Sequence, residues 1–116
     1  MIKTAAELIK EAQRKIRCLD VASARTLYEA SRSPVIIDVR EADSAAASKL
    51  NDSLNISRGL LEMNVPKTCP DADTLILTHC GGGGRASLAA LTLQDMGYTN
   101  VYAITAEFDE IKATFG

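Results

Sequence analysis

Four consecutive glycines, Gly81, Gly82, Gly83 and Gly84, follow a cysteine directly and restrict how the chain can fold around it. The segment before them, residues 74–78, is largely apolar, and residues 86–96 have a helical pattern. Glycine permits positive φ and lets backbone N–H groups converge on one point, and a helix start adds unpaired N–H groups. This order of strand, glycine loop and helix predicts an anion-binding site centred on Cys80.

A thiol in such a field loses its proton more readily, because N–H groups and the positive end of a helix stabilise the thiolate. We therefore interpret Cys80 as a nucleophile, with Arg85 as the only side-chain cation of the loop. The alternative is a buried structural thiol. A nucleotide-binding loop is disfavoured, because no Lys-Ser/Thr pair follows and the glycine spacing does not fit.

Length and composition restrict the class of protein. A chain of 116 residues, 47% hydrophobic and 24% charged, is typical of one globular domain spanning residues 1–116. The net charge of -2 and the lack of a basic block argue against a nucleic-acid partner. No apolar run approaches the roughly 20 residues that a membrane-spanning helix needs. We expect neither nucleic acid nor membrane as a partner.

The cysteines indicate the redox setting. Cys18, Cys69 and Cys80 are odd in number and widely spaced, which argues against a disulfide framework and favours a reducing, cytoplasmic location. The first residues lead into an amphipathic pattern and not into an apolar signal core, although a chain with its leader removed would look the same. A role for Cys69 as a resolving thiol is left open.

Short apolar segments alternate with helical patterns along the chain, which predicts an α/β fold with a mainly parallel sheet. The expected strands are residues 16–19, 35–37, 54–56, 75–77 and 101–104. The expected helical segments are residues 5–15, 21–28, 41–48, 57–61, 86–96 and 107–115, with a loop over residues 66–73. In such folds the loops after the strands form the site, and Asp38, Arg40 and Cys80 all lie at such positions.

Four segments together resemble the single-domain rhodanese-like sulfurtransferases. Residues 35–41 read Val-Ile-Ile-Asp-Val-Arg-Glu, and residues 54–59 read Leu-Asn-Ile-Ser-Arg-Gly. Residues 80–87 are similar to the family's active-site loop, and residues 96–102 to its Met-Gly-Tyr-x-x-Val-Tyr segment. The resemblance covers nearly the whole chain. It implies a three-layer α/β/α sandwich whose five strands are ordered 1-5-4-2-3.

The resemblance also implies an activity. Cys80 would take a sulfane sulfur from thiosulfate or a persulfide and pass it from a Cys80 persulfide to cyanide or a thiol, with no metal or organic cofactor. A sulfur-relay protein is a further partner left open. Related phosphatases and arsenate reductases have five residues between cysteine and arginine, whereas four separate Cys80 from Arg85. The shorter loop favours sulfur over phosphate.

The remaining site residues have alternative interpretations. Arg58 either guides an anionic donor or is simply solvated. Asp38 is a candidate partner for Arg85, and it is either an acceptor for loop N–H groups or a catalytic group. Asp38 and Arg40 are expected to support the loop without touching the substrate. His79 should point to the opposite face from Cys80, as a packed and hydrogen-bonded histidine.

The chain departs from the family at several positions. Gly81 stands where many active members carry a polar or cationic side chain, and Ala106-Glu107-Phe108 replaces the usual Gly-Gly-Phe. These differences predict weak thiosulfate turnover and a mobile, open loop, in which Gly82 and Gly83 need positive φ. They also keep open a second function, a catalytically weak persulfide-binding or regulatory module.

Overall fold

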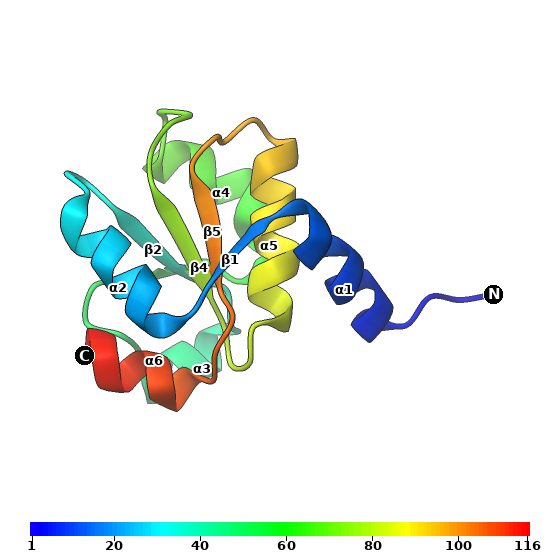
Figure 1. Cartoon of the computed structure of the whole chain (residues 1–116), viewed down its shortest axis with the longest axis horizontal. Coiled ribbons are helices and arrows are strands. Elements are labelled where there is room, and N and C mark those ends of the chain that lie inside the picture. The colour runs from blue at the N-terminus through cyan, green and yellow to red at the C-terminus, as the bar shows by residue number, and fades with distance from the viewer.

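The computed structural model describes residues 1–116 and contains one five-stranded, fully parallel sheet. The strand order is β1-β5-β4-β2-β3, which confirms the predicted fold and order (Figure 1). The strands are β1 (Arg17–Leu19), β2 (Val35–Asp38), β3 (Ser53–Asn55), β4 (Ile76–His79) and β5 (Val101–Ile104). The central strand β4 is buried along its whole length, as expected for a parallel strand with helices on both faces.

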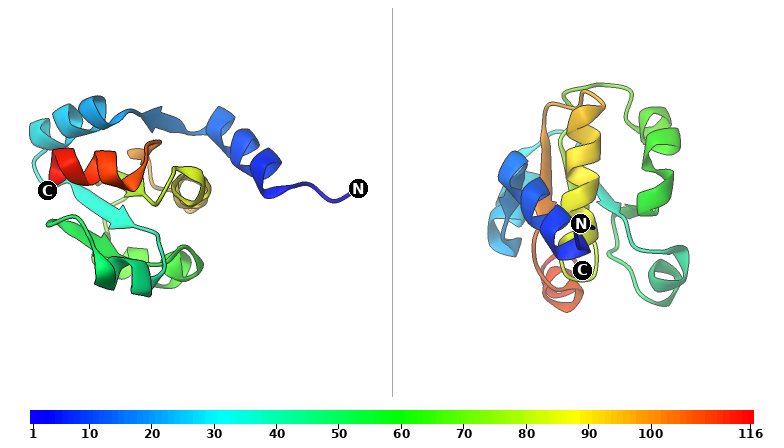
Figure 2. Two further views of the ribbon diagram at one scale, coloured as in Figure 1. Left: turned by 90° about the horizontal axis from the view of Figure 1, so that it is seen from below. Right: turned by 90° about the vertical axis from the view of Figure 1, so that its right-hand side faces the viewer.

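Helices cover both faces of this sheet (Figure 2). Helices α2 and α6 pack together on one face, while α4 and α5 lie on the other with α1 against α5. The helical elements are α1 (Ala5–Lys15), α2 (Val21–Ala30), α3 (Ala42–Ala47), the 3-10 turn η1 (Arg58–Leu60), α4 (Leu61–Thr68), α5 (Gly84–Asp95) and α6 (Phe108–Phe115). The result is the three-layer arrangement that the sequence predicted.

The core is divided by the sheet into two apolar clusters. Ile76 belongs to the cluster on the α4 and α5 side, and Leu77 belongs to the cluster on the α2 and α6 side. This alternation follows from the period of two along a strand. Each fully buried Leu or Ile contributes about 1.5–3 kcal/mol relative to an exposed position. Because both faces of β4 are covered in this way, its carboxyl end and the loop after it are held firmly.

Local signals fix several helix ends. Thr4 caps α1 in a reciprocal capping box with Glu7, and the Asp20 side chain accepts a hydrogen bond from the Ser23 N–H at the start of α2. Gly97, at φ 110°, ends α5, and the Tyr98 N–H donates to the Leu93 carbonyl across it. These ends agree with the expectations from the sequence.

Several element bounds differ from the prediction. Helix α4 covers residues 61–68 and so includes the first three residues of the predicted 66–73 loop, because it tolerates Pro66 while Leu61 and Val65 are buried one turn apart. Residues 69–73 are not helical, as predicted. Helix α5 begins at Gly84 and not at residue 86, so the last glycine is already helical. Strand β3 begins one residue early, at Ser53.

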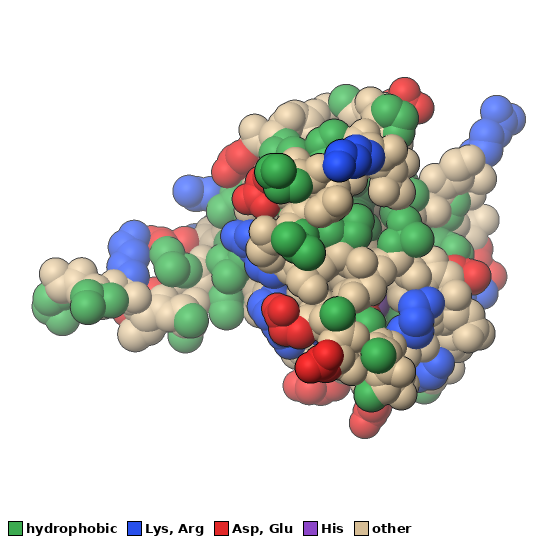
Figure 3. Space-filling model, turned by 180° about the vertical axis from the view of Figure 1, so that it is seen from behind, with side chains coloured by type: hydrophobic (Ala, Val, Ile, Leu, Met, Phe, Trp, Pro, Cys, Tyr) green, Lys and Arg blue, Asp and Glu red, His purple; other side chains and the backbone are tan.

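Helix α1 extends away from the body of the molecule (Figure 3). Only Ala12 of this helix is buried, and Met1 and Ile2 before it are fully exposed. No helix in the structure is both long enough and apolar enough to cross a bilayer. Helix α1 is attached to the rest of the protein mainly through its contact with α5.

Candidate active site

The candidate site lies where β4 ends and the glycine loop leads into α5, beside the start of α6 (Figure 1). Cys80 follows β4 directly, and its side chain joins the apolar cluster on the α5 side with only 1% of the residue exposed. The neighbouring strand β2 ends at Asp38, which pairs in register with His79. The sheet thus brings the three predicted strand-end positions to one edge.

Two backbone N–H groups point at the Cys80 sulfur. The Gly83 nitrogen lies 3.1 Å from Sγ and the Ala86 nitrogen lies 3.4 Å from it. Ala86 is in the first turn of α5, so its N–H has no partner further back in the helix. This geometry stabilises negative charge on the sulfur, both through the hydrogen bonds and through the positive end of the helix.

The four glycines differ in backbone conformation and in what surrounds them. The expectation that both Gly82 and Gly83 need positive φ is wrong for Gly82. Within the loop only Gly83 is left-handed, with φ 100°, and a Cβ there would lie 3.1 Å from the Thr105 Cα. At Gly84 a Cβ would lie 2.8 Å from Cδ1 of Ile9, on α1. Gly82 has an ordinary φ, so its lack of a side chain is not demanded by the backbone.

Two charged side chains lie over the first half of the loop, and we refer to them together as the rim. A Cβ at Gly81 would lie 3.6 Å from Nη2 of Arg85, and one at Gly82 would lie 3.6 Å from Oε1 of Glu107. Both rim residues are exposed, and neither takes part in an ion pair. In the sequence Glu107 stands out only as a departure from a glycine, and no local signal indicates that its carboxylate faces the loop.

Asp38 pairs with Arg40 and not with Arg85, which corrects the expectation that it is the partner of Arg85. Arg40 donates from Nε to Oδ1 at 3.0 Å and from Nη2 to Oδ2 at 2.8 Å, and its backbone N–H also donates to Oδ1. Burial acts to raise the pKa of Asp38, but the hydrogen bonds from Arg40 outweigh it and hold the pKa below its usual range. The Asp38 carboxylate therefore stays ionised, and both of its oxygens accept hydrogen bonds from Arg40.

The Arg40 guanidinium also fixes the surrounding loops. It donates to the Ser48 carbonyl at 2.6 Å and lies 3.9 Å from the centre of the Phe108 ring. The Phe108 N–H in turn donates to the Gly81 carbonyl at 3.0 Å. Arg40 thus connects β2 to the start of α6, and through it to the glycine loop.

Arg58 begins the 3-10 turn η1 after β3. Its backbone N–H donates to the Val39 carbonyl at 3.1 Å, and its Nε is buried without a hydrogen-bond partner. The structure therefore attaches Arg58 to the chain segment that follows β2, while a role in binding a donor stays a prediction.

His79 lies on the opposite face of the sheet from Cys80, as alternation along the strand predicts. Its ring stacks on Phe108 at a centroid distance of 6.0 Å, on the α6 side. The prediction of a hydrogen-bonded histidine is wrong, since neither ring nitrogen has a partner and the residue is fully buried. Burial lowers the pKa of His79, and the nearby Asp38 carboxylate only partly offsets this.

The other two cysteines lie away from the loop. Cys18 is exposed on β1, whereas Cys69 is buried near the amino end of β4, where its carbonyl accepts a hydrogen bond of 2.6 Å from the Tyr98 hydroxyl. Burial raises the pKa of both thiols. Because Cys69 lies at the other end of the strand from Cys80, a resolving role for it gains no support.

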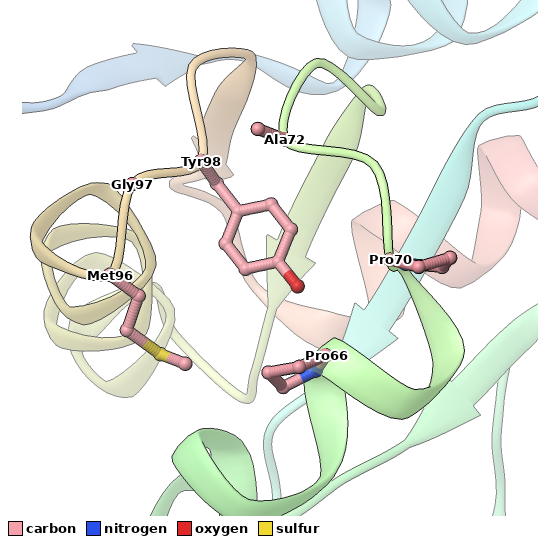
Figure 4. Close-up of a pocket in the computed structure, with 6 residues that line it drawn as sticks. All are labelled: Pro66, Pro70, Ala72, Met96, Gly97 and Tyr98. Atoms are coloured by element: carbon pink, nitrogen blue, oxygen red, sulfur yellow. The ribbon is translucent and has the colours of Figure 1, made fainter.

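The cavities of the molecule lie elsewhere than at Cys80. None of the four is lined by this residue. A cavity of about 200 Å³ lies by the end of α5, with the Tyr98 ring between the two sides of its wall (Figure 4). Its lining residues are Pro66, Pro70, Ala72, Met96, Gly97 and Tyr98. Cys80 is buried, whereas Gly82 of the loop is exposed, so the expected openness of the loop does not extend to the sulfur.

Comparisons with known proteins agree with this fold. A family model described as Rhodanese-like domain matches residues 5–114. A Rhodopseudomonas palustris protein of unknown function, described as a possible tyrosine phosphatase, is 28% identical, with a TM-score of 0.86 over 100% of this chain and 94% of its own. A search of curated proteins gave no significant match.

Two further solved structures share the fold at lower identity. A human single-domain sulfurtransferase is 23% identical, with a TM-score of 0.71 over 80% of this chain and 92% of its own. An Escherichia coli rhodanese, solved with anions, is 22% identical, with a TM-score of 0.60 over 66% of this chain and 91% of its own.

Proposed function

The chain belongs to the rhodanese-like domain family, and on this premise we propose that it is a sulfurtransferase that carries sulfane sulfur on Cys80. The observation that carries the proposal is the pair of N–H groups, from Gly83 and Ala86, that point at Sγ. Such donors stabilise the thiolate before the reaction and the terminal sulfur anion of a persulfide after it.

The proposed reaction has two displacements and no net oxidation. The Cys80 thiolate attacks the outer sulfur of a donor R–S–S⁻, the S–S bond of the donor breaks, and the donor leaves as its thiolate. The product is a persulfide, Cys80–S–S⁻. An acceptor thiolate or cyanide then attacks the outer sulfur, and Cys80 leaves as the thiolate with which it began.

The charges around the loop favour a persulfide donor over thiosulfate. Thiosulfate carries two negative charges, and Arg85 is the only cation in the loop. The Glu107 carboxylate on the rim opposes a dianion further. We therefore propose low-molecular-weight persulfides as the better donors, with a thiol, either a small molecule or a relay protein, as the acceptor.

The test is the mass of the intact protein after incubation with glutathione persulfide or with thiosulfate. We expect one added sulfur atom on the wild type, absent in Cys80→Ser, and its removal in repeated cycles when cyanide or a thiol is supplied. Failure of the wild type to take up sulfur from either donor would contradict the proposal.

A persulfide-binding or regulatory module is a second candidate, favoured by the 1% exposure of Cys80 and by the lack of a cavity over it. The same experiment separates the two functions, because a module would gain sulfur that acceptors do not remove catalytically. The description of the Rhodopseudomonas palustris protein as a possible tyrosine phosphatase motivates one more assay. Hydrolysis of an aryl phosphate by the wild type, abolished in Cys80→Ser, would favour phosphatase activity over sulfur transfer.

A further inference from the structure

A chain of hydrogen bonds runs from α1 to the Cys80 sulfur. Nε2 of Gln13 donates to Oγ of Ser87 at 3.0 Å, and Oγ of Ser87 donates to the Gly83 carbonyl at 2.7 Å. Gly83 is the residue whose N–H lies 3.1 Å from Sγ of Cys80. We propose that Gln13 and Ser87 are positioning residues, which hold Gly83 in the conformation that directs its N–H at the sulfur.

Gly83 benefits from such support because a glycine has many accessible backbone conformations. It combines a left-handed φ of 100° with the absence of a side chain, so many other backbone conformations are open to it. Its carbonyl accepts from both the N–H and the hydroxyl of Ser87, at 3.0 Å and 2.7 Å. These two donors fix the peptide plane that follows Gly83, and thereby restrict how the preceding plane, with the N–H, can turn.

The contribution of Gln13 is to orient the Ser87 hydroxyl. A hydroxyl has one proton and can direct it to any nearby acceptor. Because the Gln13 amide donates to Ser87 Oγ, the serine proton is left to point at the Gly83 carbonyl, and the two bonds reinforce each other. Ser87 is fully buried, so water does not compete for its hydroxyl.

A hydroxyl that bonds back to a carbonyl four residues earlier is common in helices and by itself indicates no function. Two features set Ser87 apart. The carbonyl belongs to the residue that donates to Cys80, and a side chain from a second helix completes the chain. Ile9 of α1 also packs on Gly84, the residue after Gly83. Helix α1 therefore contacts this region at two points, through Gln13 and through Ile9.

The structure offers a matched control at the other end of the same helix pair. Nε2 of Gln94, on α5, donates to the Lys15 carbonyl at the end of α1, also at 3.0 Å. Removing this bond weakens the contact between α1 and α5 but leaves the path to Gly83 intact. Gln13 is itself largely exposed, so Gln13→Ala removes little packing.

The experiment is a pH titration of the thiolate ultraviolet absorbance, taken as the difference from Cys80→Ser so that the other cysteines cancel. We expect Ser87→Ala to lower the thiolate-to-thiol ratio of Cys80 at a fixed pH by about two- to fivefold, and Gln13→Ala to lower it less. The double variant should match Ser87→Ala alone, because both residues act through one bond. Gln94→Ala should titrate as the wild type does.

The inference is overturned if Gln13→Ala leaves the titration unchanged, if the two effects add, or if Gln94→Ala shifts it as much. Circular dichroism identifies any variant that does not fold. If Ser87→Ala does not fold, the comparison of Gln13→Ala with Gln94→Ala still tests the inference. The inference builds on the proposed role of Cys80, but the titration needs no sulfur donor. A failure of the proposed sulfur transfer would appear in the mass measurement, whereas a failure of the positioning role would appear in the titration.

Discussion

Gly83 combines two constraints that exclude a side chain. Its φ of 100° costs other residues about 1–2 kcal/mol, and the Thr105 main chain leaves little room for a Cβ. We therefore expect Gly83→Ala to lower the free energy of unfolding by at least about 1 kcal/mol, measured in urea, and to reduce sulfur loading of Cys80 in the mass measurement.

Gly82 is the matched control for this substitution. Its backbone is not left-handed, and the nearest atom to an added Cβ is the movable Glu107 carboxylate at 3.6 Å. Gly82→Ala should change the free energy of unfolding by less than about 0.5 kcal/mol and leave loading intact. Equal losses in the two variants would show that the loop depends on flexibility in general and not on the geometry at Gly83.

The rim charge predicts how donor preference can be changed. Glu107→Gln removes a negative charge next to the loop, so the kcat/KM for thiosulfate should rise about two- to fivefold at low salt, and less at high salt. A persulfide with a single charge should gain less. Glu110→Gln, an equal change of charge at an exposed position of α6, serves as the control. A uniform gain with both variants and both donors would contradict a specific effect of Glu107.

The sequence predicts the position and role of some single residues better than those of others. The position of Cys80 follows from the run of strand, cysteine and glycines, because few other arrangements satisfy that order. The sequence does not show which glycines must lack a side chain, because this depends on contacts with Thr105 and Ile9, which are distant in sequence. Glu107 was missed for the same reason.

Among the elements, the ion pair of Asp38 and Arg40 stabilises the loops at the end of β2. Both side chains are buried, at 0% and 8% exposure, so removing one charge leaves the other unpaired. We expect Asp38→Asn to lower the free energy of unfolding by about 3–5 kcal/mol in urea denaturation. Lys3→Ala breaks the exposed pair with Glu11 and should leave the urea midpoint nearly unchanged, because solvent screens an exposed pair. Similar losses in both variants would contradict a dominant role for the buried pair.

The sequence predicted the succession of helices and strands well, because apolar runs and helical spacing differ clearly in period. It missed α4, where Pro66 suggested a loop. The spacing of Leu61 and Val65 was the available signal, since both are fully buried one helical turn apart. A local preference against helix was thus outweighed by burial of an apolar face.

For the molecule as a whole, His79 links stability to pH. Burial lowers its pKa in the folded protein, so the unfolded chain binds the proton more readily. The stabilisation is complete above the unfolded value of about 6.5 and is lost as the pH falls toward the lower pKa of the folded state. The free energy of unfolding should therefore fall as the pH drops below about 6.5, by up to roughly 1.4 kcal/mol per pH unit.

This pH dependence can be assigned, because His79 is the only histidine in the chain. His79→Leu should remove the slope and keep the free energy of unfolding at neutral pH within about 1 kcal/mol, since the ring nitrogens make no hydrogen bonds to lose. Urea denaturation at several pH values gives the measurement. A slope that persists in His79→Leu would place the titrating group elsewhere.

The overall topology, including the strand order, was predicted through the family resemblance. The burial of Cys80 was not, because its side chain packs in the apolar cluster on the α4 and α5 side, whose members come together only in the folded chain. A run of glycines in a sequence indicates conformational freedom of the backbone, but the packing around the glycines determines how much of that conformational freedom remains.

The 1% exposure of Cys80 also bears on how long the protein survives under oxidising stress. Peroxide converts accessible thiolates stepwise into sulfinic and sulfonic acids, and these products are not readily reversed. Under the proposed function, a Cys80 thiolate buried in this way would meet few such molecules. Burial would then also protect the sulfur, and one molecule of the protein would outlast many cycles of use.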